Sequence, residues 1–258
     1  HPSLENLHLV TSQTDLSITK DVFNKKPDSI VSWSSVNVDF KNEILKSIPL
    51  GIGNSFQDKY INIENVVDNL KSFKFDKEPK IYLNFRENTN LQHRKNLKDI
   101  FKNYNWATIS DSDLSLSQYN NEIADHSFAL APWGNGIDTH RIWESLYSGT
   151  IPVTKYHYTF NTLKELLVLF VNEYDDINQE LLESALEYFA DNKFNFDKLK
   201  IDYWLNERNK NNNLSNNIQE NNLYSITFNN SYKIGRYFES KKKKLYYYLR
   251  KIFNLLSS

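Results

Sequence analysis

The chain of 258 residues is long enough for one large domain or two modest ones, and 40% hydrophobic with 14% aromatic residues is typical of a globular protein. Its formal net charge of -1 gives no general attraction to nucleic acid or membrane, and the lack of cysteine excludes disulfides and thiolate metal sites. No apolar run approaches the roughly 20 residues of a membrane span, and no signal peptide is visible, so we expect a cytoplasmic protein. The chain opens on His1 without any methionine, and we therefore expect residues to be missing upstream.

The N-terminal part predicts a small α/β arrangement. Short apolar runs indicate strands at residues 7–10 and 30–33, and residues 47–53 are expected to form a third strand, broken by a turn. Residues 61–73 have helical apolar spacing. The charged, proline-containing stretch that follows marks a boundary, so we assign residues 1–75 to a first domain.

From residue 80 onward, strands and helices alternate regularly. Strands are expected at residues 80–85, 106–109, 128–131, 151–153 and 167–171, and helices at 91–104, 116–124, 138–149, 160–166 and 178–190. Such alternation with short connections is the signature of a doubly wound parallel sheet. One more amphipathic helix is expected at residues 194–207, so the second domain covers residues 76–207.

The remaining residues, 208–258, form a separate region. Asn209–Asn222 is rich in asparagine and predicts a linker, and Tyr232–Leu256 is basic and aromatic and predicts an amphipathic helix. That helix fits packing against the fold, or peripheral attachment to an anionic surface on the inner face of the membrane. One short basic run is a weak nucleic-acid footprint, and no nucleic-acid partner is expected.

The stretch Phe128–Val153 concentrates the candidate chemistry. A buried strand leads through a loop with Gly134 and Gly136 into a helix and the next strand. In open α/β sheets, ligands bind at the carboxyl ends of strands, where helix N-termini also point. The glycines would let a phosphate approach closely, and Asp138 and Thr139 stand at the N-cap, where a helix start offers N–H groups to an anion.

Charged side chains follow directly on that helix. Arg141 carries forked donors that match phosphate oxygens, and Glu144 on the same face can accept two hydrogen bonds from a ribose diol. The alternative is an ion pair between these two residues, worth only about 0.2–0.5 kcal/mol. His140 fits a packing role and a binding role equally well.

A second basic element is N-F-R-E-N-T-N-L-Q-H-R, residues 84–94. Arg86 stands at the end of a predicted strand and Arg94 in the next helix, and both can face the same sheet edge as Arg141. Two arginines there would neutralise a diphosphate leaving group, although ordinary surface charge also explains Arg94. No Walker or dinucleotide fingerprint is present, and no histidine pair has metal-binding helical spacing.

The segment P-W-G-N-G-I-D-T-H-R-I-W-E-S-L-Y-S-G-T-I-P-V, residues 132–153, resembles the donor-binding motif of the exostosin-like glycosyltransferases (glycosyltransferase family 47). That motif runs roughly P-R-G-x-G-x-D-x-x-R-x-W-E-A-L-x-x-G-C-I-P-V. Weaker similarity to bacterial members includes S-I-P-L-G-I-G-N, N-F-R-E-N-T-N-x-x-x-R and F-D-K-L-K-I-D-Y-W, within residues 5–207. Trp133 departs from the pattern, because the family usually has arginine there; that phosphate contact is then either lost or supplied by Arg86.

The resemblance implies a GT-B fold, in which the C-terminal Rossmann-like domain holds a nucleotide-diphosphate-sugar donor. It also implies inverting transfer, without metal or cofactor, to a glycan or lipid-linked glycan acceptor in polysaccharide or cell-surface glycan synthesis. Arg141 would hold the diphosphate and Glu144 the ribose. The donor-binding residues would be Arg86, Arg94, Gly134, Asn135, Gly136, Asp138, Thr139, His140, Arg141 and Glu144. About 75 residues are few for an acceptor domain, which is therefore expected to be reduced or truncated.

Inverting transfer requires a base on the acceptor side. Asp15, in the loop T-S-Q-T-D after the first strand, is the candidate, with Asp39 and His8 as alternatives. Otherwise Asp15 is a turn residue that hydrogen-bonds its own backbone. Two other hypotheses compete with the enzyme: a non-catalytic module that binds a nucleotide sugar or glycan, and a membrane-associated scaffold that acts through the C-terminal helix.

Overall fold

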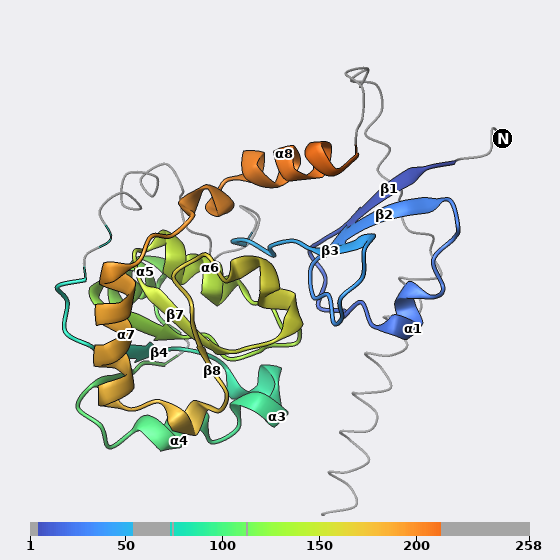
Figure 1. Cartoon of the computed structure of the whole chain (residues 1–258). Helices are drawn as coiled ribbons and strands as arrows, with labels where there is room; N and C mark the ends of the chain where they lie inside the picture. The colour runs from blue at the N-terminus through green and yellow to red at the C-terminus, as the bar shows by residue number, and fades with distance from the viewer. Residues whose placement is uncertain (1–4, 54–72, 74, 112, 213–258) are drawn as a thin grey trace, which may run out of the picture. The chain divides into compact units, whose positions relative to one another are not determined.

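The computed structural model describes residues 5–53, 73, 75–111 and 113–212, and those up to residue 208 belong to one compact unit. Two parallel sheets organise this unit, with strand orders β1-β2-β3 and β5-β4-β6-β7-β8 (Figure 1). Nearly all of the helix expected at residues 61–73, and all of the one at Tyr232–Leu256, lie outside the described residues. Within the described ranges, no helix is long and apolar enough to cross a membrane.

The smaller sheet is formed by β1 (Leu7–Thr11), β2 (Ile30–Ser35) and β3 (Leu45–Ser47). The first two predicted strands are confirmed, but the third prediction is wrong in extent: the strand lies at Leu45–Ser47, and residues 48–53 form a loop that contains Pro49, which has no N–H to donate to a strand ladder. The short helix α1 (Lys20–Phe23) between β1 and β2 was not predicted. A local core joins these elements through Ile18, Phe23, Trp33, Val38 and Leu45.

The larger sheet confirms all five strands predicted beyond residue 80. They are β4 (Ile81–Leu83), β5 (Ala107–Ile109), β6 (Phe128–Leu130), β7 (Ile151–Lys155) and β8 (Leu169–Val171), and every neighbouring pair is parallel. Because β5 lies outside β4 while β6 lies on its other side, the direction of winding reverses between β4 and β6. This is a Rossmann-like α/β arrangement, and in such sheets ligands bind beyond the strand ends at the reversal.

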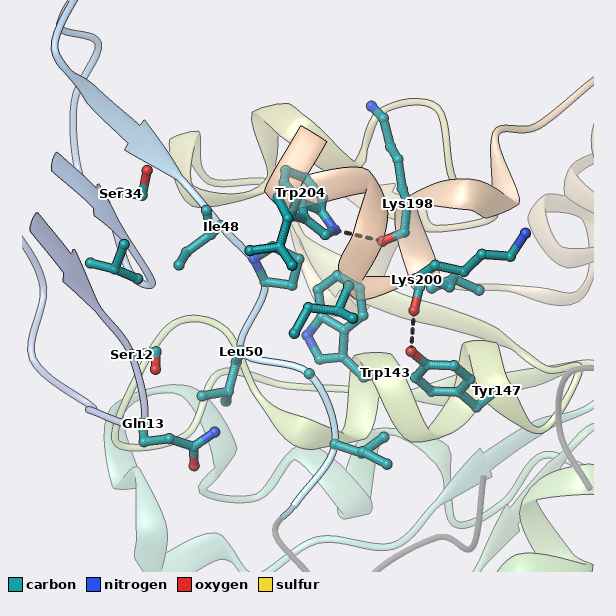
Figure 2. A pocket seen from close by; sticks show the side chains of 17 residues that line it. Ser12, Gln13, Ser34, Ile48, Leu50, Trp143, Tyr147, Lys198, Lys200 and Trp204 are labelled. Carbon is teal, nitrogen blue, oxygen red and sulfur yellow. Dashed lines mark hydrogen bonds between the residues drawn. The ribbon is translucent and has the colours of Figure 1, made fainter. Parts of the chain in front are cut away.

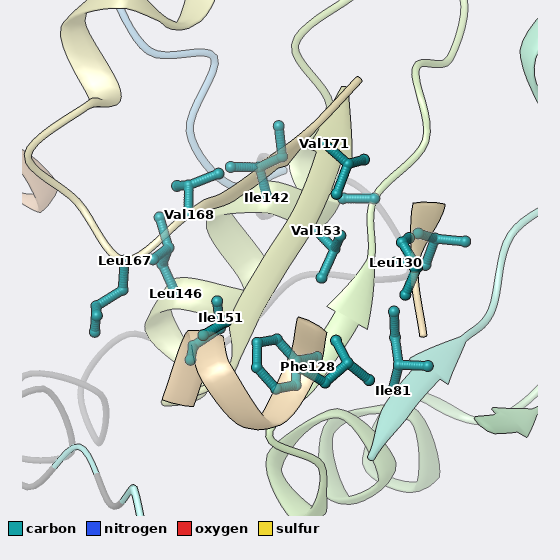
Figure 3. Close-up of a cluster of buried hydrophobic side chains, with 14 of the residues drawn as sticks. Ile81, Phe128, Leu130, Ile142, Leu146, Ile151, Val153, Leu167, Val168 and Val171 are labelled. Carbon is teal, nitrogen blue, oxygen red and sulfur yellow. The ribbon is translucent and has the colours of Figure 1, made fainter. Parts of the chain in front are cut away.

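Helices cover both faces of the larger sheet. Ile81 of β4 and its partner Phe128 of β6 belong to the main apolar cluster on one face of the sheet. This cluster also contains Ile142 and Leu146 of α6 (His140–Tyr147) (Figure 3). Tyr82 and Ala129, the next pair in register, pack on the other face against Tyr119 and Ile123 of α5 (Leu116–Asp125). Full burial of one such apolar side chain stabilises the fold by about 1.5–3 kcal/mol, so β4 and β6 each hold a helix on either face.

Three of the helices predicted around this sheet are confirmed. They are α5, α6 and α7 (Gln179–Asp191). The start of α5 is fixed by a capping box, in which Ser115 and Gln118 satisfy each other's backbone N–H groups. Asn178 caps α7 through a hydrogen bond from the N–H of Leu181.

Three other helix predictions are wrong in form. The helix expected at 91–104 divides into α3 (Leu91–Arg94) and α4 (Leu97–Phe101), because Asn96 adopts a left-handed conformation with φ of 59°. Residues 160–166 contain instead the end of a 3₁₀ helix, η4 (Tyr158–Leu163). The helix expected at 194–207 divides into η6 (Phe196–Leu199) and α8 (Ile201–Asn212), and α8 thus enters the predicted linker. Two further 3₁₀ turns are η3 (Glu87–Thr89) and η5 (Tyr174–Asp176).

Candidate functional site

A cavity of about 370 Å³ opens where the winding of the larger sheet reverses. We call it the switch-point cavity. Asn84 and Arg86, which follow β4, and Pro132, which follows β6, form one side, and residues 139–141 and Glu144 of α6 form the other. The two motifs singled out in the sequence therefore meet at the strand ends, as parallel neighbours require.

A second cavity of about 310 Å³ adjoins the first and shares Thr89, Arg94, Thr139 and His140 with it. We call it the junction cavity, because it is lined both by the glycine loop of residues 134–136 and by Asp15 from the loop after β1. Asn135 lies exposed at its rim. The structure thus brings Asp15 to the candidate donor site.

Arg94 and Asn90 hold the loop after β6 in place. Arg94 donates from Nε to the carbonyl of Trp133 (2.8 Å) and from Nη2 to that of Pro132 (2.7 Å), and Asn90 donates to the carbonyl of Gly134 (2.6 Å). The Arg94 side chain is buried, with 8% of the residue exposed, so the surface-charge explanation is wrong. Burial, and secondarily the nearby Arg141, lower the pKa of Arg94 to about 10, which keeps it charged at neutral pH.

Arg141 is a partly buried cation with unsatisfied donors. Its guanidinium lies 4.6 Å from the ring centroid of Tyr119, and its Nε is 3.5 Å from Oε2 of Glu144. The ion pair expected as the alternative is therefore present, with side chains only 18% and 15% exposed. Nevertheless, Nε and Nη1 of Arg141 are buried without a hydrogen-bond acceptor among the residues that the structure describes. A buried donor without a partner is costly, and it points to a ligand oxygen.

Tyr119 is a site residue that the sequence analysis missed. Its hydroxyl donates to Oε2 of Glu144 (2.5 Å) while its ring supports Arg141, and burial raises the pKa of the phenol well above its ordinary value. Oε2 of Glu144 is thus engaged by both neighbours. No local motif marks this residue, because the contact joins two different helices.

The start of α6 faces the cavities without a side-chain cap. Thr139 occupies the N-cap with extended backbone, but its hydroxyl makes no capping bond and is buried without a partner in the described structure. The positive end of the helix therefore remains available to an anion. His140 follows, with Nδ1 2.7 Å from the carbonyl of Gly51. Since a carbonyl only accepts, Nδ1 carries the proton, and Nε2 has the lone pair in the neutral ring.

Asp138 does not fit the donor-binding role expected from the sequence. Its Oδ2 accepts from the N–H of Leu50 (2.8 Å) and its Oδ1 from Nε1 of Trp143 (2.9 Å), so both oxygens are engaged by the protein. Its own N–H donates to Oδ1 of Asn37 (2.8 Å). Burial raises the pKa of this carboxyl to about 6 despite these hydrogen bonds. Asp138 therefore fastens the loop after β3 to the start of α6.

The two glycines of the loop make room for protein rather than for phosphate. A Cβ at Gly134 would lie 3.1 Å from Nη2 of Arg94. A Cβ at Gly136 would lie 2.8 Å from Nδ2 of Asn37 and 3.2 Å from Cα of Asp15. The close approach predicted from these glycines is real, but the approaching groups belong to the chain itself.

The two alternatives to Asp15 lie elsewhere. Asp39 accepts a hydrogen bond from Nε2 of His157 (2.9 Å), whose Nδ1 accepts from the N–H of Thr159 (3.1 Å). That pair is held by the start of η4 and lines neither of the two cavities. His8 lies on β1, where its Nδ1 is buried without a partner in the described structure.

The remaining predicted phosphate contacts differ in character. Arg86 lies at the rim of the switch-point cavity with an exposed side chain, 3.8 Å from Asp113. Trp133, which replaces the family's arginine, packs between the rings of His93 (4.8 Å) and His157 (5.4 Å) and donates to the carbonyl of Lys155 (3.2 Å). The exposed side chain of Arg86 can thus reach a ligand at the rim, whereas Trp133 serves packing.

Comparison with known proteins adds no family. Neither a scan against protein-family models nor a search of the curated proteins gives a match to this chain. The residues that the structure describes contain no group of three or more histidine, aspartate or glutamate side chains placed to hold a metal ion.

Proposed function

We propose that the protein is a glycosyltransferase that moves a sugar from a nucleotide-diphosphate-sugar donor to a glycan acceptor, on a reduced GT-B-like fold of the exostosin type. The observation that carries the proposal is Arg141. It is a partly buried guanidinium, two of whose nitrogen atoms find no hydrogen-bond acceptor within the described ranges, and it lies beside an uncapped helix start at the reversal of a parallel sheet. A diphosphate supplies the missing acceptors and satisfies the helix start as well.

The donor would occupy the switch-point cavity. Arg141 and the hydroxyl of Thr139 would hold the diphosphate, and Arg86 would add charge at the rim. Because Oε2 of Glu144 is engaged by Tyr119 and Arg141, a ribose hydroxyl would donate its hydrogen bond to Oε1. Arg94 acts indirectly: it fixes the loop that forms one side of the cavity, and its charge adds to the positive potential there.

The reaction would be a single displacement in the junction cavity. The oxygen of an acceptor hydroxyl forms a bond to the anomeric carbon while the bond from that carbon to the diphosphate breaks, and the electron pair stays on the departing phosphate oxygen. Arg141 and the start of α6 stabilise that oxygen, and the hydroxyl proton passes to the carboxylate of Asp15. A single displacement inverts the configuration at the anomeric carbon, and because these protein groups supply the positive charge, we infer that the transfer needs no metal.

The test is the affinity of the full chain for uridine, guanosine, adenosine and cytidine diphosphate, measured by calorimetry and thermal shift. Arg141→Ala should weaken the best of them about tenfold or more, since a charge-assisted hydrogen bond is worth roughly 1.5–3 kcal/mol. Lys102→Ala, which removes a cation from a surface pair with Asp99, is the matched control and should leave the affinity for each nucleoside diphosphate unchanged. Equal affinity of Arg141→Ala and wild type would refute the phosphate contact.

A second measurement separates the enzyme from the binding module. The corresponding sugar nucleotides are incubated with the protein, and free nucleoside diphosphate is measured with and without glycan acceptors. Release that depends on Asp15 supports transfer. Tight binding without any release would assign the same site to a non-catalytic module.

A further inference from the structure

A third cavity, of about 390 Å³, lies beyond the junction cavity. We call it the aromatic cavity. Figure 2 shows Ser12, Gln13 and Ser34 at the ends of β1 and β2 on one side, and Trp143, Tyr147 and Trp204 on the other. The loop of residues 48–52 contributes further apolar side chains between them. We call the strand side the polar end and the side of the rings the apolar end. Lys198 and Lys200 also line the apolar end, but their ammonium groups are paired with Glu165 (3.2 Å) and Asp197 (2.7 Å).

The apolar end offers no hydrogen bonds from its rings. Nε1 of Trp143 donates to Asp138 (2.9 Å), Nε1 of Trp204 donates to the carbonyl of Lys198 (2.8 Å), and the hydroxyl of Tyr147 donates to the carbonyl of Leu199. The polar atom of each ring thus already makes a hydrogen bond within the protein, and the ring presents only apolar surface to the cavity. A hydrocarbon group gains from this surface, whereas a polar group loses its hydration without compensation.

Two apolar side chains at the same end are exposed. Ile201 is 72% exposed and Leu205 45% exposed, and both line the cavity from α8. Ile201, Trp204 and Leu205 are spaced three and four residues apart, so their side chains share one face of α8 and line the cavity together.

The polar end leads toward the reaction centre. Gln13 and Leu50 line both the aromatic cavity and the junction cavity, where Asp15 lies. The three cavities therefore adjoin in series, from Arg141 through Asp15 to Trp204. A ligand in the aromatic cavity would have its apolar part among the rings and its polar part near Asp15.

We infer that the aromatic cavity binds the hydrocarbon part of an amphipathic acceptor, a glycoside whose aglycone is an alkyl chain. The identification of this ligand as the acceptor rests on the proposed function. Binding of the alkyl chain itself rests only on the cavity. Each methylene that enters the cavity should tighten binding about three- to fourfold, which is the burial energy of one methylene expressed as an affinity ratio.

The experiment compares octyl, hexyl and methyl β-glucoside, each below its micelle-forming concentration, by calorimetry on the full chain. Octyl glucoside should bind about tenfold more tightly than hexyl, and methyl glucoside should bind more weakly than both. Leu205→Glu should weaken octyl glucoside about tenfold or more, because it places a charge beside the alkyl chain. Ile100→Glu, which changes a 37% exposed isoleucine on α4 outside all three cavities, is the control and should leave it unchanged.

The outcomes separate this inference from the proposed function. Octyl and methyl glucoside binding equally, or octyl binding undiminished in Leu205→Glu, would overturn the aromatic cavity as an alkyl site, whatever the nucleotides do. Nucleoside diphosphates that fail to bind while octyl glucoside binds as expected would overturn the acceptor assignment together with the proposed function, and the alkyl site would stand. Both variants should keep wild-type nucleoside diphosphate affinity, because neither residue lines the switch-point cavity.

Discussion

The buried carboxyl of Asp138 should make the free energy of unfolding depend on pH, and the substitution Asp138→Asn should remove this contribution. Burial raises its pKa from 3.8 to about 6, even though Leu50 and Trp143 donate hydrogen bonds that favour the ionised form. Asp138→Asn keeps the shape of the side chain and one acceptor oxygen, but it cannot titrate. The pH-dependent part of the stability at this position should therefore disappear.

The sign and size follow from the two pKa values. Between pH 3.8 and about 6, the folded state holds a proton that the unfolded chain has released, so the free energy of unfolding falls as the pH rises through this interval. Above pH 6 the contribution is constant. A pKa difference of about 2 corresponds to about 3 kcal/mol in total, of which about 2.5 kcal/mol falls between pH 7 and pH 4.

Urea denaturation of the wild type and Asp138→Asn at several pH values between 4 and 7 measures this contribution. Other carboxyl groups titrate in both proteins, so the difference between the two free energies of unfolding isolates Asp138. The wild type should gain about 2.5 kcal/mol relative to the variant when the pH is lowered from 7 to 4. A difference that stays constant over this range would refute the burial argument, and a difference of opposite sign would mean that the hydrogen bonds outweigh the desolvation.

Three further substitutions test the loop and the base. Gly136→Ala should lower the free energy of unfolding by about 1–3 kcal/mol in urea, because its Cβ would meet Asn37; equal stability would show that the turn has spare room. Arg94→Lys should lower the free energy of unfolding by about 2 kcal/mol, because one ammonium cannot replace a guanidinium that is hydrogen-bonded to several carbonyls. A thermal midpoint equal to that of the wild type would contradict this. Asp15→Asn should slow sugar transfer about 100-fold or more while nucleoside diphosphate affinity persists; unchanged turnover removes Asp15 from the mechanism.

The strands could be predicted because their signal is local. Phe128–Leu130 and Ile81–Leu83 are buried at every position, as strands covered on both faces must be, and turn residues bound them in the sequence. The break at Asn96 could not be predicted in the same way. The apolar spacing continues across it, and the extended backbone of Lys95 followed by the left-handed conformation of Asn96 ends α3 and starts α4 afresh.

The candidate site was predictable in position but not in the roles of its residues. Motif spacing placed Arg141 and Glu144 on one helix face, and both line the switch-point cavity. The role of Asp138 depends on Leu50, which is 88 positions away in the chain, and that of Glu144 depends partly on Tyr119 from another helix. Such partners leave no trace in local spacing, because tertiary packing brings them together.

The first turn of α6 is fastened to the segment after β3 by two hydrogen bonds, from Leu50 to Asp138 and from His140 to Gly51. Leu50 and Gly51 also line the aromatic cavity, so one short piece of chain contacts both proposed ligand sites. A ligand at one site that tightens or loosens this segment changes the free energy of binding at the other site. By thermodynamic reciprocity, a ligand at the second site then changes binding at the first by the same amount. If both sites bind as proposed, the factor by which filling one site changes the dissociation constant of the other should be the same whichever site is filled first.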